Sequence, residues 1–226
     1  QKSFLVIFTH ELKTPLNAII NFSKYIRKQM LSPKEINKEK LIKLLDSILN
    51  NSHDMLENIT QILEISKLKS DKLTYNYSLF DVNNIVLDVI EKFDSLIKDK
   101  KLTLILDLTD ESFVSSDTHR VRQILSNIIS NAIKYGNNEL TITVSNIDNV
   151  TICVEDNGAG IKDKEAIFNL YSQEDDDLLE RKGQGTGIGL YFMNLLCKDL
   201  NIVHKVEDAQ ESSGTIFTII FKKQDK

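Results

Sequence analysis

The chain has 226 residues, of which 41% are hydrophobic and 27% are charged, and this composition allows one large or two modest soluble domains, of which we expect two. A net charge of −5 and the lack of a long basic cluster argue against nucleic acid as the main partner. No apolar run reaches the ~18 residues that a bilayer span needs, and no signal peptide is recognisable.

We expect a cytoplasmic location for this polypeptide. Cys153 and Cys197 lie in apolar stretches without metal-like spacing, which favours two small core residues in a reducing compartment. The chain opens at Gln1 inside a helical pattern, so we expect a further segment upstream. Any link to a membrane would run through that segment.

The first helical pattern, over residues 1–30, carries a histidine with two potential helpers. His10 is followed directly by Glu11, and Thr14 comes one turn later, near the same face. A neutral imidazole, with an ordinary pKa near ~6.5, has a ring-nitrogen lone pair that can attack phosphorus. Glu11 could orient or deprotonate the other ring nitrogen. The pattern predicts a nucleophile, although a lone helical histidine beside a glutamate is more often a solvated pair.

Pro15 interrupts the same run. A proline inside a helix removes one backbone hydrogen bond, here to the carbonyl of Glu11, so we predict a bend beside the nucleophile. The alternative is a helix that starts at Thr14 with the proline in its first turn.

A second helical pattern follows a break at residues 31–34 and runs over residues 35–68. A two-helix hairpin cannot cover both of its apolar stripes, so two chains are expected to pair into a four-helix bundle. We therefore predict a homodimer.

Beyond a polar connector at residues 70–76, helical and strand patterns alternate. The pattern predicts helices at 82–100, 117–135 and 187–200 and strands at 102–108, 140–145, 150–155, 202–206 and 215–221, with Asp117 as an N-cap. The fold class is therefore α+β: a dimerising helical hairpin over residues 1–70, followed by an α/β sandwich over residues 77–226.

Six of the eight glycines fall in two clusters. One cluster lies in Asp156-Asn157-Gly158-Ala159-Gly160, directly after a strand, and the other in residues 183–189, directly before a helix. A glycine-rich loop that opens into a helix N-terminus offers amide N–H groups to phosphates. The second cluster therefore predicts a phosphate-binding loop, although it matches neither the Walker pattern nor a dinucleotide-binding unit.

Polar side chains near these clusters suit a nucleotide. Asp156 ends a strand, where a carboxylate could accept a hydrogen bond from the exocyclic amine of adenine. Asn127, Asn131 and Lys134 lie at helical spacing on one face, where an amide oxygen suits Mg²⁺ and a lysine suits a terminal phosphate. On their own, these three residues could equally be the polar side of an exposed helix.

Together these motifs resemble the catalytic core of a sensor histidine kinase of a two-component system, over essentially the full chain. Residues 8–16 resemble the phosphoacceptor box, 127–135 the asparagine box, 156–160 the first glycine box, 167–171 the phenylalanine box and 185–190 the second glycine box. The resemblance implies an ATP-binding domain of the histidine kinase and gyrase type.

The resemblance also assigns roles to single residues. His10 would be autophosphorylated, Thr14 would place a water for the reverse phosphatase reaction, and Asn131 would ligate Mg²⁺. The implied ATP-binding residues are Asn127, Asn131, Lys134, Tyr135, Asp156, Gly158, Gly160, Ile161, Phe168, Arg181, Lys182, Gly183, Gly185, Thr186, Gly187, Ile188, Gly189 and Leu190.

The resemblance implies that ATP phosphorylates His10 and that the phosphoryl group then passes to an aspartate of a response regulator. Two alternatives compete with this interpretation. Related ATPases hydrolyse ATP with a glutamate four residues before the metal-binding asparagine, but Asn127 occupies that position here. A degenerate kinase acting only as a dimeric scaffold is the other, and it predicts no affinity for ATP.

Overall fold

The computed structural model describes residues 2–32, 37–169, 187–209 and 213–222, with the backbone alone at residues 2–8, 10 and 11. The chain divides into a helical unit, Gln1–Asp71, and an α/β unit, Lys72–Lys226. In chain order the elements are α1 (Lys2–Met30), α2 (Lys38–Lys69), β1 (Tyr77–Asp81), α3 (Val82–Lys100), β2 (Thr103–Leu108), β3 (Phe113–Asp117), α4 (Thr118–Tyr135), β4 (Glu139–Asn146), β5 (Val150–Asp156), η1 (Ala166–Phe168), α5 (Ile188–Asp199), β6 (Val203–Asp208) and β7 (Thr215–Phe221).

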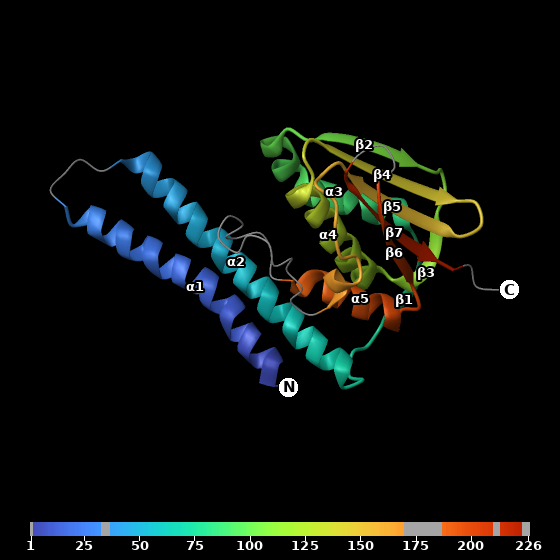
Figure 1. Ribbon diagram of the computed structural model, residues 1–226, viewed down its shortest axis with the longest axis horizontal. Helices are drawn as coiled ribbons and strands as arrows, with labels where there is room; N and C mark the ends of the chain where they lie inside the picture. The colour runs from blue at the N-terminus through green and yellow to red at the C-terminus, as the bar shows by residue number, and fades with distance from the viewer. Residues whose placement is uncertain (1, 33–36, 170–186, 210–212, 223–226) are drawn as a thin grey trace. The chain divides into compact units, whose positions relative to one another are not determined.

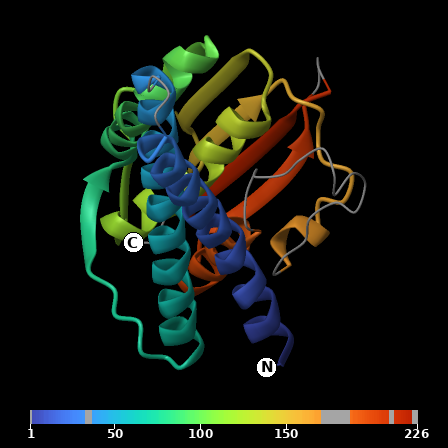
Figure 2. The ribbon, with the colours of Figure 1, turned by 90° about the vertical axis from the view of Figure 1, so that its left-hand side faces the viewer.

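The helical unit is a hairpin of two long helices, which lie side by side in both views (Figures 1 and 2). One row of α2 residues at three-, four- and seven-residue spacing is half-buried: Leu41, Leu44, Ile48, Met55 and Ile59. Helix α1 runs through Pro15 from its start at Lys2, so a helix beginning at Thr14 is wrong. The predicted two-helix hairpin is confirmed.

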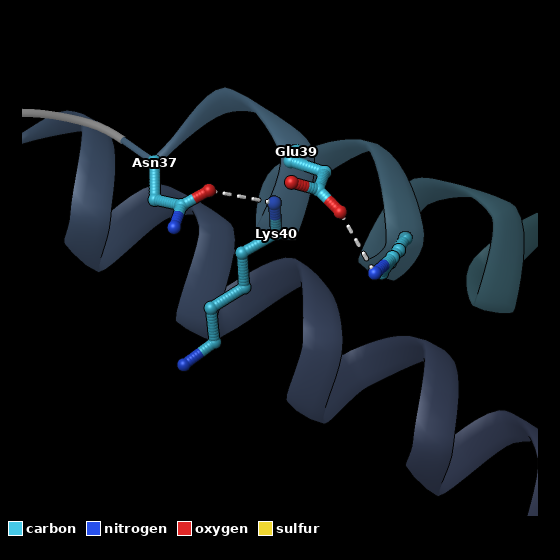
Figure 3. A network of polar contacts seen from close by, with 4 residues as sticks. Asn37, Glu39 and Lys40 are labelled. Carbon is cyan, nitrogen blue, oxygen red and sulfur yellow. Dashed lines mark hydrogen bonds and ion pairs between the residues drawn. The ribbon is translucent and has the colours of Figure 1, made fainter.

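Polar contacts mark the start of α2 (Figure 3). The side chain of Asn37 accepts the backbone N–H of Lys40 at 3.0 Å, so Asn37 is the N-cap and the helix begins at Lys38, three residues later than predicted. Glu39, in the first turn, pairs with Lys43 at 2.9 Å. The Lys40 ammonium lies 5.1 Å from the centre of the Tyr25 ring of α1, which joins the two helices near their connection.

The α/β unit is built on a five-stranded sheet in the order β2-β4-β5-β7-β6. The β2–β4 pair is parallel and the other pairs are antiparallel. Helices α3, α4 and α5 cover one face of this sheet (Figure 1). The predicted sandwich of a mixed sheet and covering helices is thereby confirmed.

The core lies between that sheet face and the helices. Along β5, Val150, Ile152, Val154 and Asp156 are buried while the residues between them are half-exposed. The facing residues of β7 and β4 continue the same apolar layer, with Ile152 beside Ile219 and Val154 beside Ile142. The alternation places a carboxylate, Asp156, at the end of an otherwise apolar row.

A second, two-stranded sheet was not predicted from the sequence. It pairs β1 with β3 antiparallel, from Tyr77 opposite Asp117 to Asp81 opposite Phe113. Each strand is only five residues long, and the partners are far apart in sequence, so no local sequence pattern predicts the pairing. The predicted N-cap of α4 is confirmed, because the Asp117 side chain accepts the backbone N–H of Arg120 at 3.0 Å.

Candidate functional site

The asparagine-bearing face of α4 is one side of the candidate nucleotide site. Asn127 and Asn131 are half-buried, whereas Lys134 and Tyr135 at the end of the helix are exposed. The Asn127 amide donates to the carbonyl of Gly189 at 3.2 Å, which connects α4 to the first turn of α5. A Cβ at Gly189 would lie 3.0 Å from the Asn127 Oδ1, so a glycine allows this close approach.

Asp156 lies at the end of β5 and is buried, with 5% of its surface exposed. Its carboxylate accepts the backbone N–H of Gly158 at 2.8 Å and a backbone N–H bond from Thr215. Burial raises the pKa of the Asp156 carboxyl above its ordinary value, although these two N–H groups act in the opposite direction. A carboxylate at the edge of an apolar layer can accept a hydrogen bond from an N–H group of a planar, aromatic ligand that packs against that layer.

Glycines surround Asp156 because the backbone segments there are in contact. A Cβ on Gly214 would lie 1.7 Å from the Asp156 carbonyl oxygen, and one on Gly158 would lie 2.4 Å from the Tyr135 carbonyl oxygen. Gly160 has φ +76° and a Cβ there would meet the Ser213 carbonyl oxygen at 2.4 Å. Of these glycines, Gly214 was missed by the sequence analysis, since it belongs to neither glycine cluster.

The start of α5 forms the described part of the predicted phosphate-binding loop. Gly187 has φ 65° and occupies the N-cap position, a left-handed conformation that favours glycine. Ile188 is buried and Leu190 half-buried, so both pack into the unit. The remaining predicted loop residues, Arg181, Lys182, Gly183, Gly185 and Thr186, lie outside the described residues.

Phe168 and Ile161 lie between the first glycine cluster and that loop, and both are half-buried. Phe168 ends the short η1 turn, and its ring meets the His204 ring edge-on, with centroids 4.8 Å apart and an interplanar angle of 69°. Lys164 forms an ion pair, at 2.8 Å, with Asp208, which lies on β6 together with His204. Together these contacts attach the segment to β6.

The predicted nucleophile lies on α1 of the helical unit. His10 and Glu11 are within the helix, and Thr14 follows one turn later with an exposed side chain. The side chains of His10 and Glu11 lie outside the described residues. Among the described residues, no group of three or more histidine, cysteine, aspartate or glutamate side chains could hold a metal ion.

Comparison with known families matches both units. Residues 1–71 match the His Kinase A (phospho-acceptor) domain family, and residues 116–225 match the family of histidine kinase-, DNA gyrase B- and HSP90-like ATPases. The chain belongs to the histidine kinases. The family predicted from the motifs is thereby confirmed, and the match of the α/β unit to an ATPase family supports ATP as the substrate.

Relatives of this histidine kinase core include larger sensor proteins. It is 30% identical to the sensor protein GacS of Pseudomonas syringae pv. syringae over 98% of this chain and 25% of that protein. It is 29% identical to the signal transduction histidine-protein kinase BarA of Escherichia coli K12 over 88% of this chain and 22% of that protein. The chain thus spans about a quarter of the length of these curated relatives.

Solved histidine kinases share the architecture. Acinetobacter baumannii histidine kinase AdeS matches with a TM-score of 0.72 and 26% identity over 96% of this chain and 98% of that one. Histidine kinase ThkA, solved in complex with the response regulator protein TrrA, matches with a TM-score of 0.70 and 20% identity over 98% of this chain and 61% of that one. None of the helices in the described ranges of this chain is both long and apolar enough to cross a bilayer.

Proposed function

We propose that this histidine kinase core transfers the γ-phosphoryl group of ATP to His10 and from there to an aspartate of a response regulator. The observation that carries the proposal is that one chain joins a phosphoacceptor-type helical hairpin bearing His10 to an ATPase-type unit with a buried, hydrogen-bonded carboxylate at Asp156. A phosphoryl donor site and an acceptor imidazole are the two components that autophosphorylation requires.

The adenine base is assigned to Asp156. Two backbone N–H groups hold its carboxylate in place, and the oxygen lone pairs that remain could accept the exocyclic amine. The exposed end of α4, with Lys134 and Tyr135, and the first turn of α5 are assigned to the rest of the nucleotide. Gly158, Gly160, Ile161 and Phe168 are assigned to the segment that lines the base.

Asn131 is assigned to Mg²⁺. Its half-buried amide lies one turn beyond Asn127 on the same face of α4, and an amide oxygen is a hard ligand of the kind that Mg²⁺ accepts. Mg²⁺ usually keeps several waters and binds substrate phosphates, so the ion would take its other ligands from the phosphates and water. Bound there, Mg²⁺ would neutralise charge on the phosphates.

The transfer itself is assigned to α1. A ring nitrogen of His10 attacks the γ-phosphorus in line, a nitrogen–phosphorus bond forms, and the bond to the bridging oxygen breaks with its electron pair leaving on ADP. Glu11 takes the proton from the other ring nitrogen. Thr14, exposed one turn later, is assigned to placing water for the phosphatase reaction.

Simple ATP hydrolysis is a weaker assignment for this site. The position of a water-activating glutamate is occupied by Asn127, which has no basic carboxylate and whose amide donates to the Gly189 carbonyl at 3.2 Å. We infer that phosphoryl transfer to the protein dominates.

The partners belong to the same proposal. A second copy of the chain would cover the remaining apolar row of the helical hairpin, and a response-regulator receiver domain would accept the phosphoryl group, as the complex of ThkA with TrrA supports. We place the kinase core in the cytoplasm.

The direct test replaces the nucleophile. His10→Gln is expected to abolish incorporation of label from γ-labelled ATP, because glutamine has no nucleophilic ring nitrogen. His53→Gln is the matched control, since His53 is an exposed histidine on α2. Acid-labile, alkali-stable label retained by the His10 variant would contradict the assignment.

A further inference from the structure

The side chain of Asn157 is hydrogen-bonded to one turn of the chain. Its Oδ1 accepts the backbone N–H groups of Asn137, Asn138 and Glu139 at 3.3, 3.2 and 3.2 Å. Its Nδ2 donates to the Asn138 side chain at 2.7 Å, and its carbonyl accepts the Asn137 side-chain amide at 2.6 Å. The side chain is therefore bonded to the connection between α4 and β4.

That turn joins two parts of the candidate nucleotide site. It follows the last residue of α4, Tyr135, and Asn157 itself follows Asp156 at the end of β5. On its far side the turn is bonded to β2, because the Asn138 carbonyl accepts the Thr103 N–H at 2.8 Å. Three consecutive N–H groups converging on one oxygen form an anchor that a hydrocarbon side chain cannot replace.

The two backbone segments held by this anchor are already in contact. A Cβ on Gly158 would lie 2.4 Å from the Tyr135 carbonyl oxygen, and one on Gly136 would lie 3.1 Å from the Asp156 Cβ. These contacts therefore fix the distance between the end of α4 and Asp156. The side-chain hydrogen bonds of Asn157 hold the end of β5 to the turn that follows α4.

We propose that Asn157 is a positioning residue that sets the place of the Asp156 carboxylate relative to the end of α4 and so determines selectivity for adenine over guanine. This inference rests on the proposed ATP site. Adenine offers an amine to the carboxylate, whereas guanine presents a carbonyl oxygen at the same ring position and repels it, so discrimination depends on where the carboxylate stands. Phosphate contacts are common to both nucleotides and do not discriminate between them.

The test measures the ratio of the dissociation constants for GTP and ATP. Both nucleotides would compete with a fluorescent ATP analogue on the whole chain with magnesium present. For Asn157→Ala we expect the ratio to fall about tenfold, which corresponds to losing roughly one well-placed hydrogen bond's discrimination, with affinity for GTP nearly unchanged. Asn157→Asp keeps the three-fold acceptor and is expected to retain most of the selectivity.

Asn146→Ala is the matched control, since it removes one side-chain bond, to the Glu111 carbonyl at 2.8 Å, at the opposite end of β4. Should Asn157→Ala not fold, Asn137→Ala removes only the 2.6 Å bond to the Asn157 carbonyl, and a lower ratio is expected there too. A folded variant of Asn157 or, failing that, of Asn137 with an unchanged ratio overturns the inference. Equal affinity of the unmodified chain for ATP and GTP would instead contradict the proposed ATP site.

Discussion

Two carboxylates of the α/β unit show how position determines charge behaviour. Asp156 ends an apolar row, and its burial raises the pKa of the carboxyl. At Asp117 burial acts in the same direction, but backbone N–H groups, first those of Asn76 and Arg120, together with the Arg120 charge outweigh it and lower the pKa. The contributions of these two residues to the stability of the fold should therefore change with pH in opposite directions.

Asp156→Asn is expected to raise the melting temperature at neutral pH while abolishing ATP binding. The folded-state pKa is raised, so the wild-type side chain stabilises the fold below its ordinary pKa of 3.8 and loses that contribution as the pH rises through the raised value. The advantage of asparagine should therefore disappear on acidification. Thermal unfolding between neutral and acidic pH checks this, and a variant less stable at neutral pH would contradict it.

Asp117→Asn is expected to lower stability at neutral pH by about 1 kcal/mol, because asparagine still caps α4 but cannot accept at two oxygens. Asp117 uses one oxygen for Arg120 and the other for the Asn76 N–H at 2.8 Å. Its lowered pKa means that the stabilisation exists above 3.8 and is lost as the pH falls through the folded value. Denaturant unfolding should give free energies of unfolding for the unmodified chain and for Asp117→Asn that converge at acidic pH. A difference that stays constant with pH would refute the contribution of the Asp117 charge.

At the scale of elements, the site depends on how closely strands and helix ends approach. Strand β7 begins at Thr215 opposite Asp156, and Gly214 immediately before it lies against the backbone of that residue. The same proximity recurs where Gly158 meets the end of α4. Backbone contact of this kind orients Asp156 more firmly than side-chain packing would, because carbonyl oxygens of paired strands cannot move aside.

Gly214→Ala is expected to destabilise the α/β unit by about 3 kcal/mol, since the added Cβ would stand 1.7 Å from a backbone oxygen. A fall in melting temperature of roughly 6–12 °C would accompany this loss. Gly189→Ala is the comparison, because its Cβ meets a side-chain atom, the Asn127 Oδ1, at 3.0 Å. Equal melting temperatures for the two variants would show that the backbone contact at Gly214 is not rigid.

At the scale of the whole molecule, the helical unit leaves apolar surface uncovered. Five large residues of α2 beside its half-buried row have between 49% and 62% of their surface exposed: Ile42, Leu45, Leu49, Leu56 and Leu63. They recur at three-, four- and seven-residue spacing, the pattern of a helix-packing seam. This row is the surface that we assign to the second chain of the proposed dimer.

Leu49→Glu combined with Leu56→Glu is expected to convert the dimer into a monomer, because two charges would have to be buried in the seam. Light scattering of the purified chain measures the mass directly. Asn50→Glu, which adds the same charge at an exposed neighbouring position, should leave the dimer intact. A monomeric wild-type chain would refute the four-helix bundle, whereas a dimeric double variant would place the interface elsewhere.

Much of the fold is predictable from local pattern. Helix α3 has the predicted bounds, and Asp117 caps α4 as expected. Strand β4 is one residue longer than predicted at each end, and β5 is one residue longer at its C-terminal end. The pairing of β1 with β3 was missed because both strands are short and meet only through the folded chain. The roles of His10, Asn131 and the other site residues stay predictions.

The amino-acid sequence alone determined the family, the order of helices and strands and the candidate residues, because periodicity and motif spacing are local properties of the chain. Only the tertiary structure decided that Asp156 is buried, that Asn157 anchors the turn after α4, and that Gly214 must lack a side chain. These facts depend on which atoms become neighbours across long stretches of sequence. Burial and backbone contact are properties of that packing, so no local pattern contains them.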